Sequence, residues 1–208
     1  MISPKQNKAF TLIELLTVIA IIAVLMGLLF PAIASVKEGA RKTQAKNDAT
    51  QIVNAIKAYN TEYGKYPSDK NPPTTTDVSI PPNGASNSTI IDILRNNTGG
   101  GNGPLVTAMN PRQIVFLDAP LASGYGTPTE KGGIGLNQKD KYLDPWGTQY
   151  GIMIDGDYDN QLTNPYTSGA GPVKLSTGVI VWSAGKDKAG GTGTFGSGTA
   201  SDDVVSWQ

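Results

Sequence analysis

The chain has 208 residues, of which 38% are hydrophobic, enough for one ordinary domain with an apolar core and one further segment. Its 17 lysines and arginines balance its 17 aspartates and glutamates, so net charge does not indicate binding to nucleic acid or to an acidic partner. Cysteine and histidine are absent, which excludes disulfides, thiolate nucleophiles, Cys/His zinc sites and imidazole-based catalysis. If the protein works outside the cell, something other than disulfides must stabilise its loops.

The N-terminal segment combines a short polar start with a long apolar run. Residues 1–9 include Lys5 and Lys8, and apolar residues then continue from Phe10 to about Ile33. This run of roughly 24 residues is long enough for a helix that spans a bilayer. An ordinary secretory signal has a shorter apolar core and a small-residue end, so we predict that residues 10–33 form a transmembrane helix that is not removed as a whole.

The helix is predicted to continue to residue 64. Pro31 removes one helical hydrogen bond and predicts a kink rather than an end, because helical periodicity resumes after it. Gly64, followed by Pro67, is a typical C-terminal stop. Residues 34–64 are therefore predicted to be an amphipathic half that packs against a soluble domain. Its apolar stripe, at steps of three and four residues, consists of Ala45, Ala49, Ile52, Ile56, Tyr59 and Tyr63.

Residues 65–208 are rich in Gly, Pro, Thr, Ser and Asn with short apolar clusters between them, which predicts strands and turns. YGIMI (150–154) and GVIVW (178–182) are expected to belong to one small antiparallel sheet. The predicted fold class is α+β, with a long N-terminal, partly transmembrane helix packed on a small antiparallel β-sheet domain. Trp146 and Trp207 are expected to be core anchors rather than ligand platforms.

A second, short helix is predicted at STIIDILRN (88–96), with Ser88 as its N-terminal cap and the glycines at 99–101 as its end. Around it, the segment 68–103 has the weakest pattern of the chain, and much of it is expected to be surface loop.

KAFTLIELL (8–16) resembles the class III leader of type IV pilin-like precursors, although Ala9 stands where glycine is commoner. A short basic leader, residues 1–9, ends at Ala9, Phe10 follows, and Glu14 is the fifth residue after this junction. The resemblance implies that a prepilin peptidase cleaves between Ala9 and Phe10 and methylates the new amine of Phe10. It also implies a pilin-like fold and assembly into a filament.

Glu14 lies within the apolar run, where a carboxylate costs roughly 2.5–3.5 kcal/mol on insertion scales and normally has a partner. Before cleavage, a position close enough to the membrane interface to reach water satisfies this requirement. In the resembling family, the glutamate of one subunit pairs with the N-terminal amine of a neighbour as the helices pack. The resemblance therefore implies that Glu14 acts in assembly by pairing with the amine of Phe10.

Three further segments are similar to the major pseudopilins of type II secretion systems: KAYNTEYGKYP (57–67), DPWGTQY (144–150) and VWSAGKDKAGG…SDDVVSW (181–207). The resemblance implies a homopolymeric pseudopilus that supports protein export. Its partners would be minor pseudopilins and an inner-membrane assembly platform, besides membrane lipid before assembly. The protein would be a single-pass inner-membrane protein with a periplasmic head, and afterwards a periplasmic or extracellular filament.

Several alternatives remain open. A type IV pilus subunit for adhesion or motility shares the leader, but its major pilins usually close the C-terminal region with a disulfide. From other classes, the chain could be a membrane-anchored enzyme with paired carboxylates or a membrane-tethered binding module; no catalytic constellation is recognisable, so no enzyme is expected. Basic residues near a membrane helix usually lie on its cytoplasmic side. Two, Lys5 and Lys8, precede the apolar run, whereas four follow it, namely Lys37, Arg41, Lys42 and Lys46. This count opposes a cytoplasmic leader. These four either remain solvated or meet acidic groups of neighbouring subunits.

Asp187, Asp202 and Asp203 flank a glycine-rich loop near the C-terminus. Calcium takes six to eight oxygen ligands from carboxylates and carbonyls on flexible backbone, and in the resembling family a calcium ion fixes this loop. The resemblance implies that the three aspartates are ligands, although the insertion between Asp187 and Asp202 is longer than the family norm. The alternative is a loop held by Asx turns.

A second candidate metal site is DGDYDN (155–160), in which Asp155, Asp157 and Asp159 alternate as at the start of an EF-hand loop. Asn160 replaces the required glycine, and Tyr166 replaces the glutamate at the twelfth position. The alternative is a polar turn after the strand at 150–154.

Overall fold

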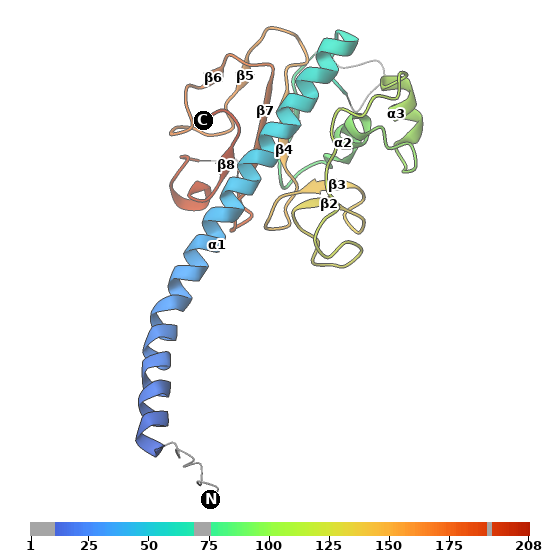
Figure 1. Cartoon of the computed structure of the whole chain (residues 1–208). Coiled ribbons are helices and arrows are strands. Elements are labelled where there is room, and N and C mark those ends of the chain that lie inside the picture. The colour runs from blue at the N-terminus through green and yellow to red at the C-terminus, as the bar shows by residue number, and fades with distance from the viewer. Residues whose placement is uncertain (1–10, 69–75, 191–192) are drawn as a thin grey trace, which may run out of the picture. The chain divides into compact units, whose positions relative to one another are not determined.

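The structure is a computed structural model that describes residues 11–68, 76–190 and 193–208. It divides into two compact units, Met1–Arg41 and Lys42–Gln208, and the helix α1 (Leu12–Tyr63) contributes to both (Figure 1). The later elements are β1 (Val78–Ile80), α2 (Ser88–Arg95), α3 (Gly103–Met109), β2 (Gly133–Gly135), β3 (Lys141–Leu143), β4 (Gly151–Ile154), β5 (Leu162–Thr163), β6 (Lys174–Leu175), β7 (Val179–Ser183), the 3₁₀ turn Gly198–Ala200 and β8 (Val204–Val205).

Helix α1 has 52 residues and continues through position 31, as predicted. It ends where the sequence predicts. Gly64 has a φ of +65°, a conformation that glycine adopts without strain, and its N–H donates to the carbonyl of Asn60 at 2.8 Å.

The second unit, which we call the head (Lys42–Gln208), contains the part of α1 that carries the predicted apolar stripe. Five of the six stripe residues are buried in the main core, and only Tyr63 is half-buried. Tyr59 is completely buried, and its hydroxyl donates to the carbonyl of Met109 in α3 at 2.6 Å. The stripe prediction is therefore confirmed, and the helix face forms one wall of the core.

The main sheet of the head is antiparallel with strand order β1-β4-β7-β8. The predicted strands at 150–154 and 178–182 are its centre, where Ile152 of β4 pairs with Val181 of β7. Because side chains alternate along a strand, Val181 packs into the main core with α1 while Trp182 enters a second apolar cluster. That second cluster comprises Leu162, Tyr166, Ala170, Leu175, Ile180, Trp182, Ala200 and Val205.

The described part of the segment that was expected to be mostly loop, residues 68 and 76–103, contains β1 besides the predicted helix α2, and α3 begins at its end. Ser88 is the first residue of α2 rather than its cap, so that prediction is wrong. The preceding residue, Asn87, is completely buried and uses its side-chain amide to donate to the carbonyls of Tyr142 and Tyr150 at 3.1 and 3.0 Å. The helix ends at Arg95, and Asn96, with φ +54°, caps it before the predicted glycines, because asparagine also tolerates the left-handed conformation.

Candidate functional site

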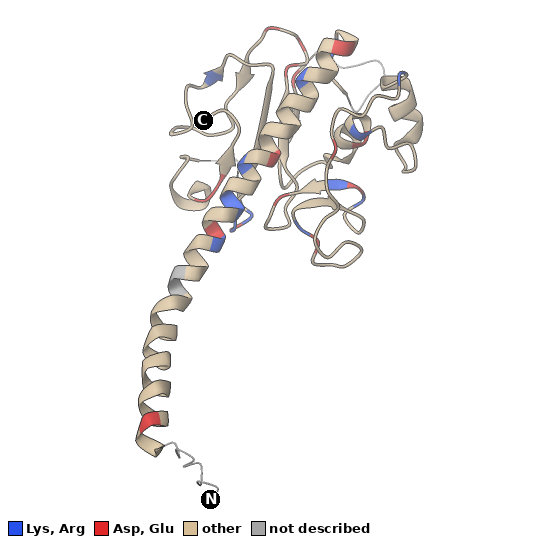
Figure 2. Ribbon diagram, in the orientation of Figure 1, with Lys and Arg blue, Asp and Glu red and all other residues tan. Residues whose placement is uncertain are grey.

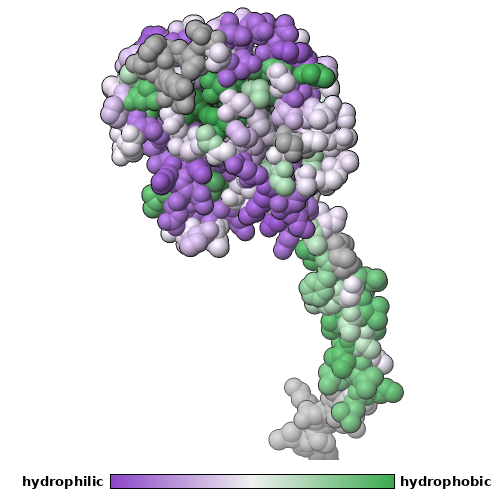
Figure 3. Space-filling view, turned by 180° about the vertical axis from the view of Figure 1, so that it is seen from behind, coloured by the Kyte–Doolittle hydropathy of each residue, from purple (hydrophilic) through white to green (hydrophobic). Residues whose placement is uncertain are grey.

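The first unit presents an apolar helix surface. No residue in the most apolar 18-residue window of α1 is buried, and α1 is the one described helix long and apolar enough to cross a membrane. Leu12 and Leu28 expose 88% and 72% of their surface, and Figure 3 shows this segment as a nearly continuous apolar surface. A surface of this kind normally contacts lipid or other protein.

Glu14 is the only charged residue between Phe10 and Val36 (Figure 2). Its Oε2 accepts hydrogen bonds from the backbone N–H and the hydroxyl of Thr11 at 2.8 and 2.7 Å. The N–H of Glu14 in turn donates to the Thr11 hydroxyl oxygen at 3.3 Å. This reciprocal arrangement is a capping box at the start of α1. Within one chain, the carboxylate therefore has a local partner.

The sequence analysis assigns Glu14 to assembly and does not predict the capping box that it forms with Thr11. A threonine followed three residues later by a glutamate, before an apolar run, is the sequence signal that identifies it. Ala9 and Phe10, the residues of the predicted cleavage and methylation, lie outside the described residues. Cleavage, methylation and the assembly role of Glu14 stay predictions.

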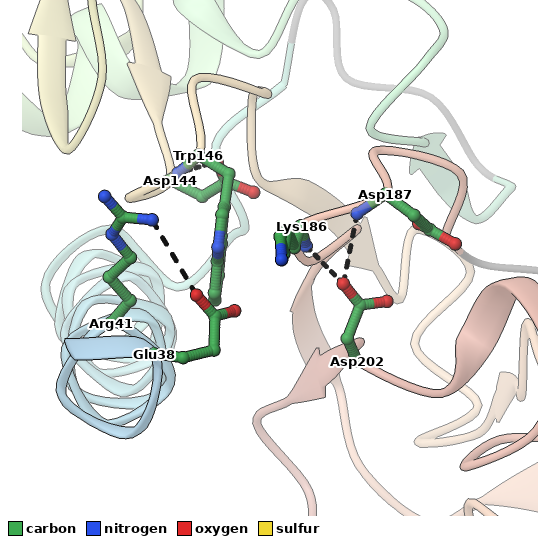
Figure 4. A network of polar contacts seen from close by, with 7 residues as sticks. All are labelled: Glu38, Arg41, Asp144, Trp146, Lys186, Asp187 and Asp202. Carbon is green, nitrogen blue, oxygen red and sulfur yellow. Dashed lines mark hydrogen bonds and ion pairs between the residues drawn. The ribbon is translucent and has the colours of Figure 1, made fainter. Parts of the chain in front are cut away.

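Two of the four basic residues after the apolar run, Arg41 and Lys46, have side-chain partners among the residues that the structure describes. Arg41 forms an ion pair with Glu38 at 3.7 Å (Figure 4). Lys46, in the head, donates from its Nζ to the carbonyl of Val205 at 2.6 Å and to that of Gln208. Lys46 thus fixes the last strand against α1.

The structure brings Asp187, Asp202 and Asp203 together, with one carboxylate oxygen of each within 4.8 Å of the others. Asp202 Oδ2 accepts the backbone N–H groups of Lys186 and of Asp187, the latter at 3.0 Å (Figure 4). Asp202 Oδ1 is buried and has no hydrogen-bond donor among the described residues. Asp203 is also buried, and its Oδ2 accepts the hydroxyl of Tyr166 at 2.7 Å. We call these three residues the C-terminal acidic cluster.

The chemistry of this cluster fits a hard cation. Three carboxylates at this separation repel one another unless a positive charge lies among them, and carboxylate oxygens are the ligands that calcium prefers. Two glycines allow the loop to pass close to the carboxylates. A Cβ at Gly185, whose φ is +64°, would lie 2.7 Å from the carboxyl carbon of Asp202, and a Cβ at Gly190 would lie 2.6 Å from Asp203 Oδ1. Calcium binding stays a prediction, as does the Asx-turn alternative, although Asp187 Oδ1 does accept the N–H of Ala189 at 2.9 Å.

The second candidate metal site has a different membership from the prediction. One oxygen each of Asp77, Asp155 and Asp157 lie within 4.8 Å of one another, and Asp159 is not in this group. Asp155 is buried and accepts the N–H groups of Tyr158 and Asn160 at 2.6 and 2.8 Å. These bonds are those of a polar turn, the alternative that the sequence leaves open.

The pairing of β1 with β4 brings Asp77 to this turn. Val78, the residue after Asp77, pairs with Ile154, the residue before Asp155. Asp77 is exposed, but partial desolvation of its carboxyl, the largest influence, and the nearby aspartates raise its pKa above the ordinary value, against the hydrogen bond from the Gly156 N–H. No local pattern in the sequence identifies this residue.

Asp144 and Glu130 are two of the buried carboxylates in the described part of the head that the sequence did not predict as site residues. Asp144 has no exposed surface; its Oδ1 accepts the N–H groups of Trp146 and Thr148 at 3.0 and 2.9 Å, and its Oδ2 accepts the hydroxyl of Ser183 at 2.6 Å. Burial raises its pKa, against these hydrogen bonds. Glu130 is 4% exposed and accepts four backbone N–H groups, from Gly126, Leu136, Asn137 and Gln138. Both carboxylates organise loops.

Comparison with protein families adds one finding. A model of the prokaryotic N-terminal methylation motif matches residues 4–30. Neither the comparison with curated proteins nor the comparison with solved structures gave a match. The prediction of a class III prepilin leader is confirmed by this motif, which is consistent with a type IV pilin-like protein. The predicted α+β fold is also confirmed, since a long apolar helix and a small antiparallel sheet domain match the pilin-like fold.

Proposed function

We propose that this chain is a structural subunit of a helical pseudopilus that assembles from the inner membrane and supports protein export by type II secretion. The observation that carries the proposal is the methylation motif at residues 4–30 directly joined to a helix whose apolar window has no buried residue. In this proposal the chain is not an enzyme. It functions by polymerisation: repeated contacts between subunits that do not close into a ring produce a fibre.

The precursor is held in the membrane by α1 as a single-pass protein with its head in the periplasm. Lipid covers the exposed apolar side chains, such as Leu12 and Leu28, before assembly. In the fibre, equivalent helices of neighbouring subunits replace the lipid. Because lipid tails and apolar side chains are similar environments, close packing and specific polar contacts must supply the preference for the fibre.

Glu14 provides such a polar contact. A prepilin peptidase cleaves between Ala9 and Phe10, and the new amine of Phe10 is then a cation at the start of the chain. In the monomer the Glu14 carboxylate accepts hydrogen bonds from the N–H and the hydroxyl of Thr11 at 2.7–2.8 Å. It therefore has hydrogen-bond donors while the unassembled subunit lies in the membrane. In the fibre it accepts the amine of a neighbouring Phe10. An unpaired charge in this apolar setting costs several kcal/mol, which sets the axial register of adjacent subunits.

The head is stabilised without disulfides, since the chain has no cysteine. We assign this role to a calcium ion held by Asp187, Asp202 and Asp203, which neutralises their mutual repulsion and fixes the loop between β7 and β8. The second acidic group, Asp77, Asp155 and Asp157, is the weaker candidate, because its buried member, Asp155, already accepts two backbone N–H groups. Minor pseudopilins and an inner-membrane platform are the expected partners in assembly.

The test is a chromosomal deletion of the gene, complemented by the wild-type chain. A pseudopilus subunit is required for release of exported proteins into the medium, and the deletion should leave surface motility and adhesion unchanged. Loss of motility or adhesion with normal secretion would instead identify a type IV pilus subunit, the alternative that shares the leader motif.

A further inference from the structure

We propose that Tyr166 is a positioning residue for the C-terminal acidic cluster and that it couples cation binding there to the packing of the second apolar cluster. The inference rests on the proposed calcium site and adds a residue and a coupling that the site itself does not require. It is carried by one buried contact between two segments far apart in the sequence.

The contact joins Tyr166, which follows β5, to Asp203, which directly precedes β8. The tyrosine hydroxyl donates to Asp203 Oδ2 at 2.7 Å. Both residues are buried, with 2% and 6% of their surface exposed. A hydroxyl that donates to a carboxylate in a buried setting makes a strong, charge-assisted hydrogen bond. It therefore restricts the rotation of the Asp203 carboxylate and presents it in one orientation.

The ring of Tyr166 belongs to the second apolar cluster, so its position is set by packing rather than by the aspartate. It contacts the ring of Phe195 edge to face at 5.2 Å and that of Trp207 at 6.1 Å between ring centroids. Phe195 lies in the same loop that connects Asp187 to Asp202. Tyr166 thus contacts the acidic loop through its ring and an acidic side chain through its hydroxyl.

Backbone bonds attach the loop to the chain immediately after Tyr166. The N–H of Thr167 donates to the carbonyl of Gly193 at 2.8 Å, and the N–H of Phe195 donates to the carbonyl of Ser168 at 2.9 Å. On the other side, the indole N–H of Trp207 donates to the carbonyl of Ala170 at 2.7 Å. The segment 166–170 is consequently held between the acidic loop and the end of the chain.

This arrangement has a reciprocal consequence. Groups that orient a ligand to a metal raise metal affinity, and loss of such a group typically lowers affinity 10- to 100-fold. By linkage, a cation that holds Asp203 also favours the packed position of Tyr166 and its aromatic neighbours. Cation binding should therefore change the environment of Trp207, which lies in the head far along the chain from Asp187.

The experiment uses the full-length mature protein in detergent micelles, stripped of divalent ions and titrated with calcium in a calorimeter. The wild-type protein is compared with Tyr166→Phe, which keeps the ring and removes the hydroxyl. We expect the dissociation constant for calcium to rise at least tenfold in the variant. The matched control is Tyr59→Phe, which removes an equally buried hydroxyl from the main core and should leave the calcium affinity unchanged.

The outcomes separate the inference from the site on which it rests. Equal calcium affinity of the wild type and Tyr166→Phe would overturn the positioning role while the calcium site stands. No calcium binding by the folded wild type would overturn the site and the inference together. If Tyr166→Phe does not fold, tryptophan fluorescence of the wild type decides. A calcium-dependent change that is lost in Trp207→Phe supports the coupling, and a spectrum unaffected by saturating calcium contradicts it.

Discussion

The N-terminal part of α1 and the head differ in how far they bury their apolar side chains and in where the partners of their carboxylates come from. From Leu12 to Val36 the helix exposes apolar residues and carries one carboxylate, whose partner is three residues away. The head buries most of its large apolar residues in two clusters, and its buried carboxylates accept backbone N–H groups from nearby residues and hydroxyls from distant segments. The first region therefore depends on its surroundings for completion, while the head is largely complete in itself. Changes in the two regions should accordingly affect different properties, assembly in one and folding in the other.

The largest effect is expected from Glu14→Ala. Membrane insertion should persist, because the substitution makes the helix more apolar, but fibres should be reduced at least tenfold, since the amine of each Phe10 loses its partner. Sheared fibres and membrane fractions are quantified by immunoblot. Glu38→Ala, which removes a carboxylate from the same helix outside the apolar run, should assemble normally. Wild-type amounts of fibre from Glu14→Ala would remove the assembly role.

Asp144→Ala should show the converse behaviour, with loss of head stability. The change leaves two backbone N–H groups and the Ser183 hydroxyl without their buried acceptor, and we expect the free energy of unfolding to fall by about 3 kcal/mol. Chemical denaturation monitored by circular dichroism measures it. Asp118→Ala, at an exposed aspartate, is the control and should change the stability by less than about 0.5 kcal/mol. An equal effect of both variants would show that the Asp144 network does not stabilise the head.

Calcium removal should destabilise the head by a similar or smaller amount. At a calcium concentration one hundred times its dissociation constant, a bound ion contributes about 2.7 kcal/mol, which corresponds to a rise in Tm of about 5–10 °C for a protein of this size. Differential scanning calorimetry with calcium or with a chelator measures the shift. Asp202→Asn should abolish it, because Asp202 contributes the buried carboxylate oxygen that has no donor in the described structure. A Tm unchanged by chelator would favour a loop held by Asx turns.

Glu130 gives a smaller, pH-dependent effect. Burial alone raises the pKa of this carboxyl, but the four N–H donors outweigh burial and hold the pKa below its ordinary value of 4.5. A lowered folded-state pKa contributes stability that is present above the unfolded value and is lost as the pH falls through the folded value. The difference in Tm between the wild type and Glu130→Gln should therefore be constant above about pH 5.5 and shrink as the pH falls below 4.5. A difference independent of pH from 7 to 3 would contradict the role of the charge.

The predictable parts of this molecule are those with local patterns. The 3.6-residue stripe identifies the buried face of α1, Gly64 identifies its end, and runs of β-branched residues identify β4 and β7. Each of these patterns extends over one element and reflects a single physical requirement, namely burial of one face or freedom of one φ angle. The leader is equally local, which explains why 27 contiguous residues suffice for a family match.

The features that the sequence does not predict depend on distant segments. The carbonyls that accept hydrogen bonds from the Asn87 side chain lie more than 50 positions away in the chain. The neighbours of Ser88 in the sequence do not reveal these bonds, so Ser88 was predicted as the cap. Asp77 reaches Asp155 only through the pairing of β1 with β4. The site residues show the same division: the three C-terminal aspartates were identified by motif, whereas the Tyr166 hydroxyl that contacts one of them is 37 positions away in the chain.

The central claim is that the uncovered helix of this chain becomes covered by other copies of the same chain once the leader is removed. Its most direct test is expression of the precursor with an active or an inactive prepilin peptidase, followed by shearing and electron microscopy. The account predicts fibres only with the active peptidase, built from a chain whose first residue by mass spectrometry is methylated Phe10. A correctly cleaved chain that remains monodisperse, with no fibres, would contradict it.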